Sequence, residues 1–137
     1  MAREQERRKN RSEKQIEALK KQLQHVAREG GFKAALLATA DGELINDIES
    51  TYESDKLSDL ANTIGQMLPN ARDKADLSPI QQITLTDNSG NIMFFRFFNV
   101  LEQPVVLIVI TRNAITVVEL IERAVLGIKR ILTQARK

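Results

Sequence analysis

The hydrophobic pattern between residues 80 and 111 predicts three β-strands, around which the rest of the chain is arranged. In the first of them, Ile83 and Leu85 alternate with polar residues, which is typical of a strand with one wet face or of an edge strand. The second and third strands, 92–98 and 105–111, are apolar at nearly every position, so both of their faces should be buried. We therefore expect a sheet with helices on both faces and a polar edge at the first strand that can pair with another strand.

Apolar residues at helical spacing predict one helix before this region and another after it. The first helix begins at Glu13 and ends at the glycine pair Gly30-Gly31. The last helix opens at Thr116, whose spacing to Glu119 is that of a capping box. The residues expected to face the sheet are Ile16, Leu19, Leu23 and Val26 in the first helix, and Val117, Leu120, Ile121, Ala124, Ile128, Ile131 and Leu132 in the last.

A hairpin and a third helix are expected between the first helix and the sheet strands. Strands at 32–40 and 43–48 flank the turn Asp41-Gly42, and the charges of the second strand predict a blunted edge. The middle helix has a candidate cap at Ser54 or Asp55 and should end or kink at Pro69, before a polar connection. Its expected inward residues are Leu57, Leu60, Ala61, Ile64, Met67 and Leu68.

Positive charge is concentrated at the N-terminus. Residues 1–29 hold nine Lys and Arg against five Asp and Glu, a net charge of +4, whereas the whole chain carries +2. We interpret residues 1–12 as a frayed, solvated extension of a single domain at 13–137. The alternative is a basic arm that touches nucleic acid, acidic lipid or an acidic protein patch. The cations of this arm are Arg3, Arg7, Arg8, Lys9 and Arg11.

The sequence lacks the residue combinations of common catalytic and metal sites. It has no cysteine and a single histidine, His25, which lies off the apolar stripe and is interpreted as an exposed helix residue. A glycine-rich phosphate loop and a paired-carboxylate motif are also missing. We therefore expect no enzymatic activity, no metal and no cofactor. The lack of a signal-peptide pattern and of an apolar run of about 20 residues favours a cytoplasmic location without membrane insertion.

Arg96 is the unusual charge of the predicted sheet, because it interrupts a run of phenylalanines. It shares a strand face with Phe94 and Phe98, so it needs an ion partner or a route to water. A snorkelling side chain with a local carboxylate is the simpler interpretation. A contact to a partner, or across a dimer, is the functional one.

Several segments are specific in combination: the glycine pair, the Phe-Lys-Ala-Ala-Leu-Leu-Ala-Thr-Ala-Asp-Gly hairpin at 32–42, the 83–98 hairpin with its Asp-Asn-Ser-Gly turn, and the apolar strand 105–110. With this order of elements, residues 14–137 resemble the roadblock/dynein light chain family, including its bacterial and archaeal members. The resemblance implies an α+β sandwich with profilin-like layering. Its five-stranded antiparallel sheet would have the order 2-1-5-4-3, with the first and last helices on one face and the middle helix on the other.

The resemblance also implies a function. Members of this family scaffold and regulate small Ras-like GTPases, or attach to motor and motility complexes, without catalytic residues of their own. They dimerise by pairing their third strands, with the two middle helices side by side, and the small residues Ala61 and Gly65 would let those helices approach closely. The implied homodimer interface consists of Ile80, Gln82, Ile83, Thr84, Leu85 and Thr86 in the strand, and Leu57, Ala61, Ile64, Gly65 and Leu68 in the helix.

Three functions therefore remain open from the sequence. The first is a homodimeric adaptor for a small Ras-like GTPase or a motility protein. The second is binding to nucleic acid or an acidic surface through the basic N-terminal helix, although nucleic acid is not the expected partner. The third is a small-molecule sensor with a cleft between the sheet and the middle helix, suggested by the irregularities at Gly65 and Pro69.

Overall fold

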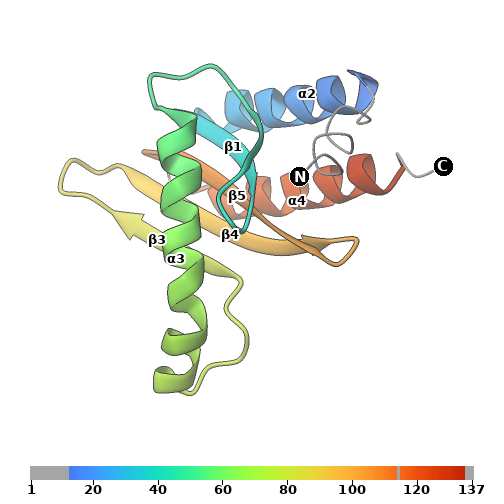
Figure 1. Cartoon of the computed structure of the whole chain (residues 1–137). Helices are drawn as coiled ribbons and strands as arrows, with labels where there is room; N and C mark the ends of the chain where they lie inside the picture. Colours follow the sequence, from blue (N-terminus) through green and yellow to red (C-terminus); the bar gives the residue numbers. More distant parts are fainter. Residues whose placement is uncertain (1–12, 114, 135–137) are drawn as a thin grey trace.

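A computed structural model of the chain describes residues 13–113 and 115–134, so the predicted arm at 1–12 lies outside the described residues. The helices and strands follow the order expected from the sequence (Figure 1). In chain order they are α2 (Glu13–Gly30), β1 (Ala34–Thr39), β2 (Leu44–Asp47), α3 (Ser54–Ala75), β3 (Gln82–Thr86), β4 (Ile92–Val100), β5 (Gln103–Thr111) and α4 (Val117–Gln134).

The five strands form one antiparallel sheet in the order β2-β1-β5-β4-β3, which confirms the predicted topology. β5 is central and pairs with β4 from Thr111 opposite Ile92 to Gln103 opposite Val100. Every residue of β1 is buried, and β5 is buried from Val105 onward. The continuously apolar strands therefore occupy the centre, and the mixed strands β2 and β3 form the edges.

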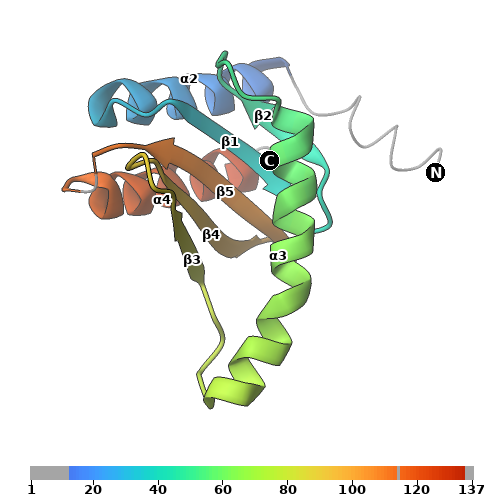
Figure 2. The same cartoon turned by 90° about the vertical axis from the view of Figure 1, so that its left-hand side faces the viewer.

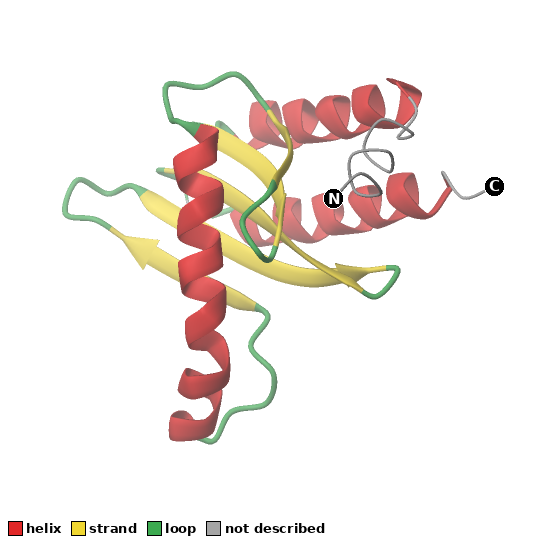
Figure 3. Ribbon diagram, in the orientation of Figure 1, coloured by secondary structure: helices red, strands yellow, loops and turns green. Residues whose placement is uncertain are grey.

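Helices cover both faces of the sheet, in the predicted layers (Figures 2 and 3). α2 and α4 lie side by side on one face, where Leu23 and Ile121 pack with Phe98 in one hydrophobic core. α3 crosses the other face, where Ala61 packs with Phe95 in a second core. None of the described helices is long and apolar enough to cross a membrane.

The end of α3 differs from the prediction. The helix does not stop at Pro69 but continues to Ala75, so the expected connection at 70–77 is mostly helical. Proline lacks the N–H that would bond the carbonyl oxygen of Gly65. The helix nevertheless continues beyond the proline, through the exposed residues 70–75. It extends beyond the sheet at its C-terminal end (Figure 1).

The start of α3 also differs. Ser54 is the first helical residue and Glu53 takes the cap position without a side-chain hydrogen bond. The hydroxyl of Ser54 instead donates to Asp47 Oδ2 at 2.6 Å, which ties the helix to β2.

Three residues that were expected to face the sheet are exposed: Ile16 in α2, and Leu60 and Met67 in α3. In α2 the fully buried stripe begins at Leu19. In α3 the exposed pair lies on the flank of the buried stripe, because an apolar stripe wider than the contact surface leaves its border residues in water.

Candidate protein-interaction site

β3 is an open edge whose backbone groups alternate between β4 and solvent. At the start of the strand, the Phe97 N–H donates to the carbonyl oxygen of Gln81 at 2.7 Å. Because such bonds involve every second residue of an antiparallel strand, the odd-numbered residues of β3 bond to β4. The N–H and C=O groups of Gln82, Thr84 and Thr86 therefore point away from the sheet, where they can pair with another strand.

The side chains of β3 are accessible as well. Thr84, Leu85 and Thr86 are exposed, whereas Ile80, Gln82 and Ile83 are half-buried. Ile83 and Leu85 lie opposite Phe95 and Met93 of β4, so they share the face that carries α3. The strand thus presents an apolar pair on the α3 face and threonines on the other.

The opposite edge is closed by side chains. Asp47 of β2 has both outward backbone groups occupied: its N–H donates to Asn46 Oδ1 at 2.8 Å, and its carbonyl oxygen accepts from Lys20 Nζ at 2.9 Å. A register shift between Leu37 and Ala38 further disturbs the ladder on β1. A short, charged and irregular edge does not accept another strand. The predicted blunting of 43–48 therefore has a structural basis, and β3 is the edge that is available.

Exposed apolar side chains accompany the open edge on the α3 face of the molecule. Met67 of α3 is 60% exposed and Leu85 of β3 is 46% exposed. Met93 and Phe97 of β4 are only partly buried against the second core. α3 packs mainly on β2, β1 and β5, which leaves the β4–β3 side of this face less covered. We call the following residues the β3–α3 surface: Leu60, Met67, Ile83, Leu85, Met93 and Phe97.

Part of the helix in the predicted dimer interface is buried within the protomer, and the interface itself stays a prediction. Leu57, Ala61 and Ile64 are buried against the chain's own sheet. A Cβ atom built on Gly65 would lie 3.6 Å from Phe97 Cε1. The small residues at 61 and 65 thus allow close approach of α3 to its own sheet. Gly65 and Leu68 are half-buried. The large apolar side chains that α3 exposes are Leu60 and Met67, which the sequence analysis placed on the inward face.

Arg96 finds its partner within the chain. Its guanidinium donates from Nε to Glu122 Oε1 of α4 at 2.9 Å, and from Nη1 to the Phe97 carbonyl oxygen at 2.6 Å. These bonds confirm the interpretation that Arg96 has a local carboxylate partner, and they connect α4 to β4. A contact of Arg96 with another protein stays a prediction.

Among the described residues, His25 is the remaining polar candidate. His25 is exposed on α2, as predicted, with Nε2 at 3.1 Å from Glu29 Oε1. In residues 13–113 and 115–134, no group of three or more His, Cys, Asp or Glu residues is placed to hold a metal ion. The basic arm lies outside these residues, so the nucleic-acid alternative stays a prediction.

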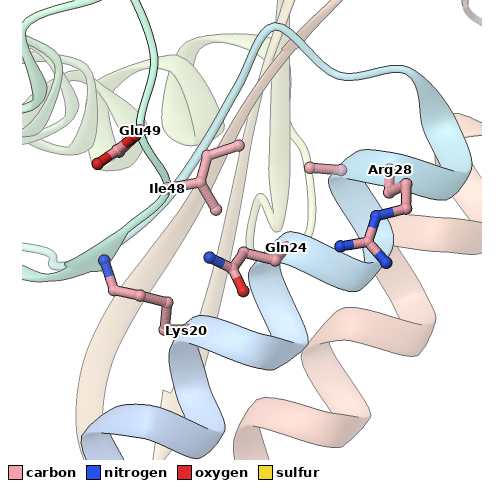
Figure 4. Close-up of a pocket in the computed structure, with 6 residues that line it drawn as sticks. Lys20, Gln24, Arg28, Ile48 and Glu49 are labelled. Carbon is pink, nitrogen blue, oxygen red and sulfur yellow. The ribbon is translucent and has the colours of Figure 1, made fainter.

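A shallow pocket of about 360 Å³ lies between α2 and the end of β2 (Figure 4). Lys20, Gln24 and Arg28 line it from α2, and Ile48 and Glu49 from the opposite side. The sensor hypothesis required a cleft between the sheet and the middle helix instead. Leu57, Ala61 and Ile64 pack into that space, and the sensor hypothesis stays a prediction.

Solved structures share this fold. Myxococcus xanthus MglB aligns with a TM-score of 0.73 and 18% identity, over 92% of this chain and 96% of that one. The gliding protein MglB from Thermus thermophilus aligns at 0.69 and 16%, over 88% and 92%. A roadblock/LC7 domain from Streptomyces avermitilis aligns at 0.65 and 13%, over 85% and 96%. No protein-family model matches the sequence, and no curated protein matches it either.

These alignments span nearly the full length of each chain, although few residues are identical. They agree with the sheet order β2-β1-β5-β4-β3 and with one helix opposite two. The chain therefore has the roadblock/LC7 fold that its sequence pattern predicted.

Proposed function

We propose that the chain is a non-enzymatic homodimeric adaptor that binds and regulates a small Ras-like GTPase or a motility complex. The proposed dimer is supported by the open β3 edge and by the exposed apolar residues of the β3–α3 surface beside it. The partner class is supported by the fold shared with MglB gliding proteins and by the resemblance of the sequence to the roadblock family.

A second copy of the chain can extend the sheet across a two-fold axis at Thr84. In this register Gln82 lies opposite Thr86 of the partner subunit, so all the outward backbone groups of β3 form hydrogen-bonded pairs. Ile83 then faces Leu85 of the partner subunit on the α3 face. Such apolar cross-strand pairs contribute roughly 0.2–1 kcal/mol each. The partner would also cover exposed residues of the β3–α3 surface.

Replacing Thr84 with proline tests this interface, because it removes an outward N–H without removing a bond to β4. We expect the wild-type chain to have at least twice the mass of 15.5 kDa in light scattering, and Thr84→Pro to lose the β3 contact and become smaller. Thr84→Val keeps the N–H and should retain the wild-type mass. Ile83→Pro should instead destabilise the protomer, because the Ile83 N–H bonds to β4.

A second variant covers the case in which Thr84→Pro does not fold. Leu85→Glu puts one carboxylate from each subunit into the apolar contact between the two β3 strands. Because residue 85 is exposed in the protomer, the fold of the protomer should remain intact. If both variants are folded, as judged by circular dichroism, and keep the wild-type mass, the β3 interface is wrong.

Partner binding needs a separate measurement. Small Ras-like GTPases encoded in the same genome would be titrated with the protein in their GDP-bound and GTP-analogue-bound states. A regulator should bind one nucleotide state more tightly, since it can shift an equilibrium only by its differential affinity. Equal binding to both states would contradict regulation through the nucleotide state, whatever the result for the dimer.

A further inference from the structure

The hairpin between β4 and β5 ends in a tip that extends beyond the neighbouring strands (Figure 3). On one side, β3 accompanies β4 only as far as Phe97, whose N–H bonds to the carbonyl oxygen of Gln81. On the other side, β1 accompanies β5 as far as Pro104, whose carbonyl oxygen accepts the Ala40 N–H at 3.0 Å. Residues 99–103 therefore lie beyond both neighbouring strands and form a projecting tip.

The base of this tip is fixed in the hydrophobic core. Phe98 and Val100 are buried among the side chains of α2 and α4. Val100 also lies opposite Gln103 in the ladder between the two strands. Because the last core residue directly precedes the turn, the tip is held in place by the protomer, and a partner would not have to order it on binding.

Leu101 and Glu102 form the turn itself, in a conformation that is unusual for their residue types. Both φ angles lie in the left-handed region, for which two-residue hairpin turns usually contain Asn-Gly. The other two hairpins of the described sheet have glycine at such positions: Gly42 has a φ of 98° and Gly90 a φ of 88°. A bulky residue with a positive φ is an outlier, and backbone outliers cluster at functional sites.

The tip presents one apolar side chain and one charge. Leu101 is 46% exposed at the apex. Glu102 is exposed next to it and forms no ion pair within the part of the chain that the structure describes. Single exposed apolar residues are common. Leu101 differs from them because it projects from a rigid base and occupies a backbone position that favours asparagine or glycine.

We infer that Leu101 is an anchor that inserts into an apolar pocket of the GTPase, with Glu102 paired to a cation at the rim of that pocket. This inference rests on the proposed function, because it names the contact by which the same adaptor would hold its GTPase. An aliphatic anchor in a pocket is a typical centre of a protein interface. The carboxylate beside it adds specificity and speeds association. The GTPase surface recognised therefore combines an apolar pocket with a neighbouring Lys or Arg.

The tip is compatible with the proposed dimer. The shared ladder would run from Gln82 to Thr86, and Gln82 lies opposite Arg96 of β4. Leu101 follows the end of β4 at Val100, so it lies beyond the paired segment. A two-fold axis at the β3 edge reverses the strand direction, so the dimer would present one tip at each end of the continuous sheet. Dimerisation and binding at the tip can therefore be measured separately.

The turn offers a test in which unfolding cannot explain a loss of binding. Leu101→Asn/Glu102→Gly supplies the residues that two-residue turns prefer, so this variant should be at least as stable as the wild type. Against a GTPase that binds the wild type, we expect it to bind at least about tenfold more weakly in isothermal titration calorimetry. Its mass in light scattering should equal that of the wild type, because β3 is unchanged.

Single substitutions separate the two side chains. Leu101→Ala keeps the charge of Glu102 and should weaken binding about tenfold. Glu102→Gln removes the charge with little change of shape, so it should weaken binding roughly threefold, mainly through slower association, and this difference should decrease at high salt. Leu126→Ala is the matched control: Leu126 is 62% exposed on α4, outside the tip, and its replacement should leave the affinity unchanged.

The outcomes distinguish this inference from the proposed function. Equal affinities of the wild type and Leu101→Asn/Glu102→Gly would overturn the inference and leave the proposed function in place. An equal loss in Leu126→Ala would also overturn it, since any exposed leucine would then have the same effect. If no GTPase binds the wild type in either nucleotide state, the proposed function fails and the inferred role of the tip fails with it.

Discussion

Leu101 and Glu102 form the turn between β4 and β5 in a conformation that their side chains disfavour. Their φ angles are 51° and 68°, in the left-handed region. This region costs roughly 1–2 kcal/mol for a residue with a Cβ atom. The paired change Leu101→Asn and Glu102→Gly supplies the residues that such two-residue turns prefer. It should raise the free energy of unfolding by about 1 kcal/mol, measured by urea denaturation.

A double alanine variant at 101 and 102 is the matched control. It removes the same exposed side chains and keeps the backbone penalty, so it should not stabilise the protein. An equal gain in both variants would mean that loss of the exposed side chains, rather than the backbone, is responsible.

Asp87 organises the turn next to the open edge. Its carboxylate accepts the backbone N–H groups of Ser89 and Asn91, at 2.9 and 2.8 Å, and the Asn91 side-chain amide at 2.9 Å. Hydrogen bonds from Asn91, and to a smaller extent from Ser89, together with the positive charge of the nearby Arg112, hold the pKa of Asp87 below its usual 3.8.

A lowered carboxyl pKa stabilises the folded state above the unfolded pKa, and this contribution is lost as the pH falls through the folded pKa. Asp87→Asn should therefore lower the melting temperature at neutral pH. The difference from wild type should shrink as the pH falls below the usual 3.8 and through the lowered folded pKa of Asp87, because both side chains are then neutral. A difference that is the same at both pH values would indicate that charge plays no part in this turn.

At the scale of single residues, the sequence predicts which side chains are exposed better than it predicts which side chains interact with each other. The spacing of His25 predicts an exposed helix residue, and the alternation of the strand predicts the face of Arg96. The identity of the Arg96 partner could not be predicted, because Glu122 lies 26 residues away and is brought close only by the packing of α4 on β4.

Helix α3 illustrates what local patterns predict about an element and where they fail. The helical spacing of its apolar residues and the turn residues around it predict that α3 exists. The same spacing predicts its buried stripe, because the side that packs on the sheet is apolar. Its end was mispredicted, since Pro69 removes one hydrogen bond and the helix nevertheless continues to Ala75. The outward position of Leu60 and Met67 depends on the width of the contact with the sheet, which is a property of the packed molecule.

Gly65 in α3 and Gly30 at the end of α2 allow a matched pair of alanine substitutions with opposite expected effects on stability. A Cβ atom at Gly65 would meet its nearest neighbours at 3.6 and 3.7 Å, which are ordinary contacts. Gly65→Ala should therefore stabilise the protein by about 1 kcal/mol through the lower entropy of the unfolded chain. At Gly30 the same atom would lie 2.2 Å from the Phe32 ring, so Gly30→Ala should be destabilising by about 1–3 kcal/mol.

The urea midpoints of Gly65→Ala and Gly30→Ala, each compared with that of the wild type, test the two predictions. A destabilised Gly65→Ala variant would mean that α3 requires a closer approach to the sheet than these distances indicate.

For the whole molecule, the number of apolar faces in each strand predicts which strands are central and which are edges, whereas the full strand order was implied by the resemblance to the roadblock family. The strands at 34–39, 92–100 and 103–111 are apolar and lie at the centre, while β2 and β3 are mixed and lie at the edges. The candidate site was predicted only in part. That β3 is open while β2 is closed depends on Lys20 reaching Asp47, a contact across 27 residues that no local pattern contains.

The proposed shared sheet gives the molecule a stability that depends on its concentration. Association stabilises only the folded state, so the melting temperature of a dimer rises with protein concentration. We expect such a rise over about a hundredfold range of protein concentration for the wild type, and none for Thr84→Pro, which lacks the β3 contact. Thr84→Val keeps the outward N–H and should show the same rise as the wild type. A concentration-independent wild type would exclude coupling of the β3 interface to folding, while a dependence that persists in Thr84→Pro would place the main contact on another surface.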